Sequence, residues 1–160
     1  MALRYVFDQP EIVANCVAML LPNVRSRGFG KCAAIGVIDE DGKLIGGLVY
    51  SNWNPEAGII EIHGAAIHPR WLTRETIRHM YQFPFHQLGV QMIVQQTPAE
   101  NIRLLRQLAA YNYSFIKVPR MFGRDKDGVL CCLTYEDWCD NSFNKRFRHH
   151  IRPEQLEEAA

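Results

Sequence analysis

The pattern of apolar and polar residues changes its period several times along the chain, and each change marks the expected start of a new element. A short strand is expected over residues 3–7. Asp8 is then placed to cap a helix that has Pro10 and Glu11 in its first turn, and Pro22 ends this helix. The stripe expected to face the core consists of Ile12, Val13, Cys16, Val17 and Leu20.

Three more strands follow from the next part of the pattern. Apolar runs over residues 32–38 and 44–50 flank an Asp41-Gly42 turn, which is typical of a β-hairpin. A third run over residues 59–67 predicts an antiparallel meander beside the short first strand. Alternation with period two gives this third run one face with Glu61, His63 and Ala65 and another with Ile60, Ile62 and Gly64.

From residue 73 onward the period becomes helical. Thr73 is placed to cap a helix, Pro84 is expected to kink it and Gly89 to end it. The residues expected on its inner side are Ile77, Met80, Tyr81 and Leu88.

The remaining elements are shorter. A strand is expected over residues 90–95, and Pro98 is expected to open a second helix. The inner side of that helix is predicted to carry Ile102, Leu105, Leu108 and Ala109. A strand over residues 113–118 and a hairpin that turns at residues 124–128 complete the pattern.

This order of elements predicts an α/β fold with a mixed sheet. An antiparallel meander and a central parallel pair of strands would be flanked by helices. Residues 1–138 are interpreted as one domain and residues 139–160 as a polar C-terminal helix or tail. Basic residues gather in that tail at Lys145, Arg146, Arg148, His149, His150 and Arg152, and glutamates follow them. A solvated helix or a subunit contact is the simpler interpretation of this cluster, and RNA binding is the alternative.

Composition narrows the class of protein. The 160 residues are 48% hydrophobic and 22% charged, which indicates a globular domain and excludes collagen-like and coiled-coil chains. The formal net charge of +1 gives no general attraction to nucleic acid or membranes. Because no membrane span or leader is visible, a cytoplasmic location is expected. The five cysteines lack metal-ligand spacing, so we expect reduced, mostly core thiols and no metal site.

Three local stretches, together with the order of elements, resemble the GNAT acetyltransferase superfamily, and in particular GNAT-like proteins of phages and prophages. The stretches are residues 28–37, residues 68–74, and residues 97–101 with 112–115. The resemblance covers roughly residues 3–138 and implies the acyl-CoA N-acyltransferase fold. It also implies acetyl-CoA as the co-substrate.

Physical reasoning places the cofactor phosphates at the helix that starts near residue 73. A helix N-terminus offers unpaired N–H groups and a favourable dipole. The residues expected at this turn are Arg70, Thr73, Arg74, Glu75 and Thr76. The resemblance implies that the pantetheine arm pairs with backbone groups at Ala65, Ala66 and Ile67, with Gly64 as a bulge. It also implies a cofactor contact by Asn101, for which simple helix capping is the alternative.

Acetyl transfer to an amine needs a proton acceptor. Glu61 is the first candidate, because burial raises the pKa of a carboxyl group, and His63 is the second. Tyr111 is the candidate donor of a proton to the leaving thiolate.

The sequence departs from the family pattern in two places, and these departures support an alternative function. The turn at residues 72–77 has no glycine, and Leu108 stands where many members of the family carry a tyrosine. The predicted function is therefore an N-acetyltransferase acting by direct transfer in a ternary complex, and the alternative is a catalytically inactive GNAT-like binding or structural module. The acceptor is expected to be a small-molecule or peptide amine. The sequence leaves the oligomeric state open, with a homodimer among the assemblies it allows.

Overall fold

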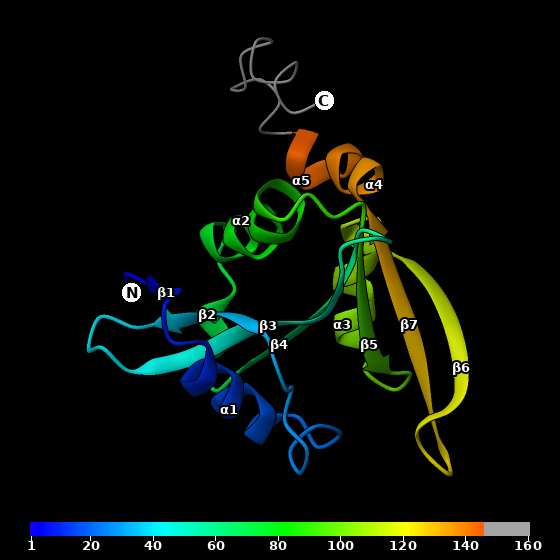
Figure 1. The fold of residues 1–160 in the computed structure, drawn as a ribbon, viewed down its shortest axis with the longest axis horizontal. Coiled ribbons are helices and arrows are strands. Elements are labelled where there is room, and N and C mark those ends of the chain that lie inside the picture. Colours follow the sequence, from blue (N-terminus) through cyan, green and yellow to red (C-terminus); the bar gives the residue numbers. More distant parts are fainter. Residues whose placement is uncertain (146–160) are drawn as a thin grey trace. The chain divides into compact units, whose positions relative to one another are not determined.

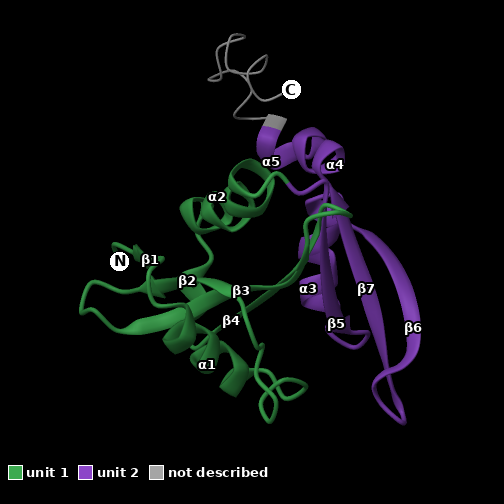
Figure 2. Ribbon diagram, viewed as in Figure 1, with its two compact units in different colours: residues 1–89 green, residues 90–160 purple. Residues whose placement is uncertain are grey.

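The computed structural model describes residues 1–145, and these form two compact units, one covering Met1–Gly89 and the other beginning at Val90 (Figure 2). The first contains β1 (Arg4–Val6), α1 (Pro10–Leu20), β2 (Ala33–Ile38), β3 (Leu44–Asn54), β4 (Ile59–Ala66), the 3-10 turn η1 (Pro69–Trp71), α2 (Arg74–Gln82) and the π-helical turn η2 (Phe83–Gln87).

The first unit is built on the predicted antiparallel meander. Its strands pair in the order β1-β2-β3-β4, and every pairing is antiparallel. At the hairpin turn, Asp39 Oδ1 accepts hydrogen bonds from the N–H groups of Asp41 and Lys43, and Gly42 takes a φ of 81°. In Figure 1, α1 and α2 lie on opposite faces of this meander. The sheet of this unit is therefore covered on both sides.

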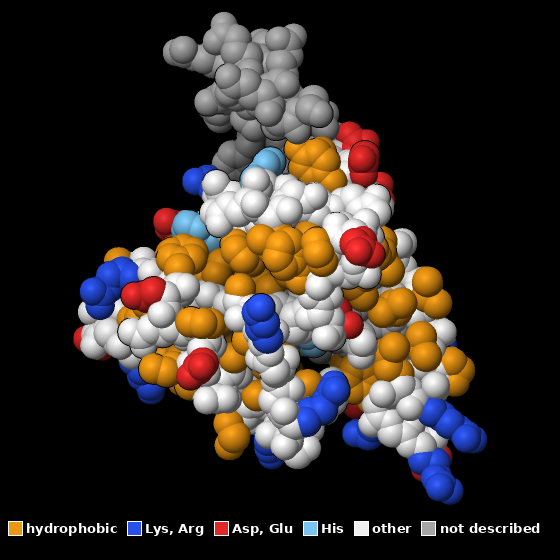
Figure 3. Space-filling view, in the orientation of Figure 1, with side chains coloured by type: hydrophobic (Ala, Val, Ile, Leu, Met, Phe, Trp, Pro, Cys, Tyr) orange, Lys and Arg blue, Asp and Glu red, His pale blue; other side chains and the backbone are white. Residues whose placement is uncertain are grey.

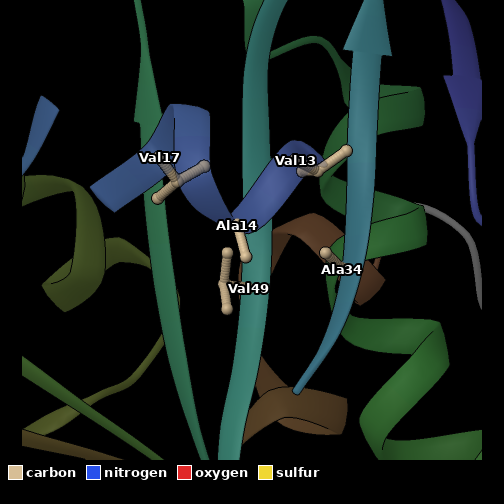
Figure 4. Packing of buried hydrophobic residues seen from close by; sticks show 5 residues of the cluster. All are labelled: Val13, Ala14, Val17, Ala34 and Val49. Atoms are coloured by element: carbon tan, nitrogen blue, oxygen red, sulfur yellow. The ribbon is translucent and has the colours of Figure 1, made fainter. Parts of the chain in front are cut away.

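Helix α1 approaches the sheet closely because glycines lie beneath it. A Cβ atom built on Gly47 would lie 2.7 Å from Val13 Cγ1 and 2.9 Å from Val17 Cγ2, and one built on Gly36 would lie 2.9 Å from Val13 Cγ2. The buried cluster between helix and sheet is formed by Val13, Ala14, Val17, Ala34 and Val49 (Figure 4). Close approach lets short valine and alanine side chains fill this core.

Two expectations about α1 are wrong. The predicted inner stripe included Ile12, Cys16 and Leu20, and all three are exposed in the structure. The helix is apolar around most of its circumference, so periodicity alone does not select the buried face, which is set by the glycines of the sheet. The N-cap is Gln9 rather than Asp8, and its side chain makes no capping hydrogen bond.

The opposite face of the meander carries Trp71 and α2. Trp71 lies across two strands, because Cβ atoms built on Gly46 and Gly64 would lie 3.0 and 3.3 Å from its ring atoms. Tyr50 donates a hydrogen bond from its hydroxyl to the carbonyl oxygen of Met80 at 2.7 Å. These contacts attach the chain that follows β4 to the sheet.

The second unit contains a three-stranded antiparallel sheet in the order β5-β7-β6. Its elements are β5 (Met92–Pro98), α3 (Ile102–Ala110), β6 (Ser114–Gly123), β7 (Lys126–Thr134), α4 (Tyr135–Asp140) and α5 (Ser142–Lys145). Together the two units confirm the predicted mixed α/β class. The predicted parallel pair would join β4 and β5, which belong to different units, and it remains a prediction.

Some boundaries in the second unit differ from those expected. Pro98 ends β5, where it pairs with Gly128, and α3 begins only after Asn101. The side-chain cap of Asn101 and not the proline therefore sets the start of this helix. Ile102 and Ala109, expected inside, are exposed.

Three further expectations concern cysteines, membranes and the tail. Of the five cysteines only Cys131 is buried, and burial raises the pKa of its thiol to about 12, whereas Cys16 is exposed. The expectation of mostly core thiols is therefore wrong.

Within residues 1–145, no helix has the length and apolar character needed to cross a bilayer. Most of the basic cluster of the tail lies beyond residue 145, outside the described residues, and the domain division at residue 138 remains a prediction.

Candidate active site

Strand β4 carries two titratable side chains on the face that α1 covers. Glu61 pairs with Ser51 across the sheet, and His63 pairs with Val49. Directly paired residues of antiparallel strands project to the same face, and Val49 belongs to the core beneath α1. The structure thus confirms the predicted alternation, which placed Glu61 and His63 together.

The imidazole of His63 lies between two polar groups and an aromatic ring. Its Nε2 atom is 3.5 Å from Glu61 Oε2 and 3.3 Å from Ser51 Oγ. The ring centroid of Phe29, in the loop after α1, is 4.8 Å from that of His63. The side chains of His63 and Glu61 are only 12% and 23% exposed. The pair is thus held in a largely enclosed position.

This geometry favours one tautomer of His63. A proton on Nε2 can be donated to the Glu61 carboxylate, and Nδ1 then carries the lone pair. Among residues 1–145, no side chain or backbone group forms a hydrogen bond with Nδ1. The nitrogen able to accept a proton is therefore the one not engaged by Glu61 and Ser51.

The pKa of Glu61 is lowered and not raised, so the expectation that burial would make it the better base is wrong. The main cause is the hydrogen bond from His63, which outweighs the opposing effect of burial. A hydrogen bond from Asn52 and the positive charges of His63 and Arg27 lower the pKa further. Glu61 is accordingly a carboxylate near neutral pH, suited to orienting an imidazole and stabilising its protonated form.

A β-bulge in β3 places Asn52 beside Glu61. The register between β3 and β4 shifts between Ser51 and Asn54, and Asn52 takes a φ of 51°. An asparagine tolerates this left-handed conformation better than most residues. The bulge lies here and not at Gly64, where the pairing of the two strands is regular.

Sequence reasoning missed Ser51 and Asn52 as neighbours of the pair. The polar run Ser51-Asn52-Trp53-Asn54 directly after a buried strand was the one available signal. Contacts across β3 and from the loop after α1 depend on register and loop conformation, which residue patterns alone do not specify.

Ser51, His63 and Glu61 do not form a nucleophilic triad. In such triads the serine and the acid bind opposite nitrogens of the histidine ring, whereas here both contact Nε2. Ser51 is also only 4% exposed. The cluster is therefore arranged for proton transfer to an external group rather than for an acyl-serine intermediate.

A second cluster of polar groups forms the turn between β4 and α2. Thr73 Oγ1 accepts a hydrogen bond from the N–H of Thr76 at 3.2 Å, which confirms the predicted cap. Thr76 Oγ1 donates to the carbonyl oxygen of Trp71 at 2.7 Å. The hydroxyl of Tyr5 in β1 lies 2.9 Å from Thr76 Oγ1 and 3.4 Å from Thr73 Oγ1. The turn is thus braced by three hydroxyl groups, and the side chain of Thr76 is fully buried.

The outer side of this turn offers donors that suit phosphate oxygens. Arg70 and Arg74 are exposed. The N–H groups of Arg74 and Glu75 lie in the first turn of α2, where a helix supplies no carbonyl partner. The Glu75 carboxylate is directed along the helix, with Oε1 3.9 Å from His79 Nε2. Because Thr76 uses its hydroxyl internally, any contribution of Thr76 to a ligand would be indirect.

The end of β4 was expected to provide backbone groups for a pantetheine arm. Ala65 and Ala66 pair with Gly47 and Gly46 of β3. The N–H of Ile67 donates to the carbonyl oxygen of Ile45 at 2.8 Å, so this N–H is already used within the sheet. Alternate backbone groups of Ala65 and Ala66 remain as candidates, because a strand pairs with each neighbour through every second residue.

Two candidate residues belong to the second unit. Asn101 Oδ1 accepts a hydrogen bond from the N–H of Leu104 at 3.3 Å, so its side chain caps α3. Burial raises the pKa of Tyr111, and its hydroxyl accepts a hydrogen bond from Gln107 at 3.4 Å. The Tyr111 ring packs edge-on against Trp138. Both residues therefore have structural roles within their own unit.

No group of three or more His, Cys, Asp or Glu side chains that could hold a metal ion occurs within the part of the chain that the structure describes.

Comparison with known proteins identifies the fold. No protein-family model and no curated protein sequence matches the chain. Solved acetyltransferase structures do match. A chimera of the spermidine N-acetyltransferase SpeG from Vibrio cholerae with hSSAT is 12% identical with a TM-score of 0.71, over 88% of this chain and 100% of the other. The ribosomal-protein-S5-alanine acetyltransferase from Vibrio fischeri is 12% identical with a TM-score of 0.65, over 86% and 96% of the two chains.

A GCN5-related N-acetyltransferase from Brucella melitensis is 19% identical with a TM-score of 0.59, over 78% of this chain and 59% of the other. At these identities the similarity shows the fold alone. The chain therefore has the mixed α/β fold of the acetyltransferases, as the resemblance implied.

Proposed function

We propose that this protein is an N-acetyltransferase that moves an acetyl group from acetyl-CoA directly to an amine in a ternary complex. The observation that carries the proposal is the enclosed pair of Glu61 and His63, which lies on β4 of an acetyltransferase fold and has one imidazole nitrogen unengaged. The similarity to solved acetyltransferases supports the same class of reaction.

In this proposal His63 is the proton acceptor and Glu61 is its positioning partner. The amine must lose a proton as its nitrogen attacks the thioester carbonyl carbon. His63 Nδ1 takes that proton, and the Glu61 carboxylate stabilises the imidazolium through Nε2. The carbon–sulfur bond then breaks, and the thiolate of coenzyme A leaves with a proton from Tyr111 or from water. Orientation of the two substrates contributes much of the acceleration.

The turn before α2 would hold the pyrophosphate of acetyl-CoA. Arg70 and Arg74 supply positive charge, and the N–H groups of Arg74 and Glu75 supply donors. Thr73 and Thr76 keep the turn in shape through their hydrogen bonds. Backbone groups of Ala65 and Ala66, and the side chain of Asn101, are the proposed contacts with the arm of the cofactor. Acetyl-CoA supplies the activated acetyl group.

The acceptor is an amine on a small molecule or a peptide. Glu61 is the single carboxylate in the cluster, and it is already engaged by the hydrogen bond from His63 and the positive charge of Arg27. A polyamine needs further acidic side chains for its second ammonium group, so we expect spermidine to be a poor acceptor. We further propose a cytoplasmic protein with no nucleic-acid or membrane partner, either monomeric or a homodimer, of a kind encoded by phages.

The test measures two quantities. One is the release of coenzyme A in the presence of an amine, and the other is the binding of acetyl-CoA, followed by isothermal titration calorimetry. Because the chain contains five cysteines, release is followed by chromatography rather than by a thiol reagent. His63→Gln should lower kcat by about a hundredfold or more and leave the Kd for acetyl-CoA unchanged. The matched control His86→Gln changes a histidine outside the site.

The alternative, an inactive GNAT-like module, makes a different prediction. Such a module would release no coenzyme A with any amine, and the wild-type protein and His63→Gln would behave alike. That result would overturn the proposed activity. Absence of heat with acetyl-CoA would overturn the proposed cofactor site as well.

A further inference from the structure

Asn52 lies in a backbone conformation that glycine adopts more readily than asparagine. Its φ of 51° falls in the left-handed region, which costs free energy for most residues with a side chain. The residue belongs to the bulge of β3, where the pairing with β4 changes register between Ser51 and Asn54. In a regular strand residue 52 would point to the face opposite Ser51 and Glu61, because side chains alternate. The bulge brings the side chain of Asn52 back to Glu61 instead.

The structure on both sides of the bulge is fixed by pairing. Ser51 pairs with Glu61 on one side, and Asn54 pairs with Ile59 on the other. Beyond the bulge, the side chain and the carbonyl oxygen of Asn54 accept the hydrogen bonds that close the turn between β3 and β4. Asn52 therefore cannot relax to a regular strand conformation without breaking pairs on either side of it. Strained backbone that is enforced in this way is concentrated at functional sites.

The conformation by itself does not require an asparagine. A glycine would adopt it without strain, because it has no Cβ atom. Burial does not require the amide either, since Asn52 is exposed and water can satisfy its polar atoms. What the asparagine adds is a hydrogen bond from its amide N–H to the carboxylate of Glu61. The side chain of Asn52 thus acts on Glu61, and the fold can form without it.

The other groups that act on Glu61 do not fix its direction. Arg27, in the loop after α1, acts on the carboxylate through its charge, and its side chain is exposed. Figure 3 shows basic side chains where Figure 1 draws this loop. His63 donates a hydrogen bond to Glu61, but His63 is the ring that the carboxylate has to orient. Asn52 is therefore a neutral donor, attached to the sheet, that holds the carboxylate from outside the pair.

We propose that Asn52 is a positioning residue of the candidate active site. Its amide holds the Glu61 carboxylate against Nε2 of His63, so that Nδ1 is left to take the proton from the amine. This inference rests on the proposed acetyltransferase function and adds to that site a residue that acts through Glu61. The left-handed backbone of Asn52 is the conformation that aims the amide at this carboxylate.

The experiment compares variants of the full-length protein that keep the bulge. Asn52→Gly keeps the left-handed backbone and removes the amide. Asn52→Asp keeps the size of the side chain and replaces its donor by an acceptor. The matched control is Asn112→Gly in the second unit. Asn112 has a φ of 71°, and its amide also donates a hydrogen bond, to the carbonyl oxygen of Asp137 at 3.0 Å.

Two readouts separate the local effect from the reaction. The titration of the Glu61 carboxyl group is followed by carbon NMR in protein labelled at the glutamate side chains, and the spectrum of Glu61→Gln assigns its signal. Release of coenzyme A with a panel of small amines and short peptides gives kcat. Isothermal titration calorimetry gives the Kd for acetyl-CoA, and scanning calorimetry gives the Tm.

In Asn52→Gly the pKa of Glu61 should rise, because the carboxylate loses a hydrogen bond that favours its charged form. In Asn52→Asp it should rise further, because a second carboxylate then lies beside the first. The kcat of Asn52→Gly should fall about fivefold, the effect of about one hydrogen bond, while the Kd for acetyl-CoA and the Tm stay close to the wild-type values. Asn112→Gly should change neither the pKa of Glu61 nor kcat.

Three results would overturn the inference. An unchanged pKa of Glu61 in Asn52→Gly would show that the amide does not hold the carboxylate. A raised pKa with an unchanged kcat would show that the hydrogen bond has no role in the reaction. An equal loss of kcat in Asn112→Gly would show that replacing a left-handed asparagine slows the reaction through the fold. If the wild-type protein acetylates no amine, the proposed function fails and the role of Asn52 in it fails too, whereas the NMR titration still decides whether Asn52 holds Glu61.

Discussion

Removal of the Tyr5 hydroxyl should loosen the turn that precedes α2. This hydroxyl comes from β1, about seventy residues away in sequence, and lies 2.9 Å from Thr76 Oγ1 and 3.4 Å from Thr73 Oγ1. Tyr5→Phe removes these two contacts and keeps the ring, whose centroid is 4.4 Å from that of His79. The variant therefore tests the hydroxyl alone.

The expected loss of stability depends on which hydrogen bonds of the turn remain in the variant. Thr76 Oγ1 still donates to the carbonyl oxygen of Trp71 and still contacts Thr73, so no buried hydroxyl is left without a partner. Loss of one such hydrogen bond lowers the free energy of unfolding by about 1 kcal/mol. For a chain of this size Tm should fall by roughly 2–4 °C. If the turn of the variant is loosened in the free protein and must be ordered again at this cost when the ligand binds, the Kd for acetyl-CoA should rise about fivefold.

Differential scanning calorimetry measures the first effect, and titration with acetyl-CoA measures the second. Val37→Ile, a change at the residue paired with Tyr5 in the adjacent strand, serves as a control for disturbance of the sheet. A Tyr5→Phe variant with unchanged Tm and unchanged acetyl-CoA affinity would refute the reasoning that the hydroxyl braces the turn. Loss of stability without loss of affinity would refute the link between the turn and the cofactor.

Three further predictions concern the site and its supports. Because the folded state lowers the pKa of Glu61, its ionised form adds stability above the unfolded pKa, and this contribution disappears as the pH falls through the folded pKa. Glu61→Gln should therefore destabilise the protein at pH 7, and its stability should converge with that of the wild type in acid unfolding curves. Its kcat should fall because His63 loses its partner. A difference in stability that stays constant at all pH values would contradict this. Gly47→Ala should lower the unfolding free energy by about 1–3 kcal/mol in urea titrations, because its Cβ atom would lie within 2.9 Å of two valines of α1, and an unchanged midpoint would show that the helix moves freely. Asn101→Ala should lower the free energy of unfolding by about 1 kcal/mol, whereas Asn101→Ser should keep it near the wild-type value. If Asn101→Ser also keeps the wild-type affinity for acetyl-CoA, the asparagine is a cap and makes no specific cofactor contact.

Patterns of residues predicted the elements of the first unit well because β2 and β3 are apolar runs, β4 alternates between polar and apolar residues, and the turns carry strong local signals. The Asp41-Gly42 hairpin and the Thr73 cap both lie where the sequence placed them. The alternation along β4 also brought Glu61 and His63 together correctly. Local chemistry fixes these features.

Features that depend on distant partners were not predictable in the same way. The buried side of α1 is set by the glycines of β2 and β3 and not by the period of the helix itself. The pKa of Glu61 is lowered by the hydrogen bond from His63, whereas burial alone would have raised it. No motif marked Tyr5, because its partners Thr73 and Thr76 lie about seventy residues later in the sequence.

The bulge of β3 has a consequence for how such a protein changes over generations. Two residues, Asn52 and Trp53, occupy the space that one residue would fill in a regular strand, and Trp53 points outward, 51% exposed. Deleting Trp53 would leave the hairpins and both helices in register while withdrawing the amide of Asn52 from Glu61. The loss of a single codon would thus keep the scaffold and remove the hydrogen bond from Asn52 that helps to lower the pKa of Glu61.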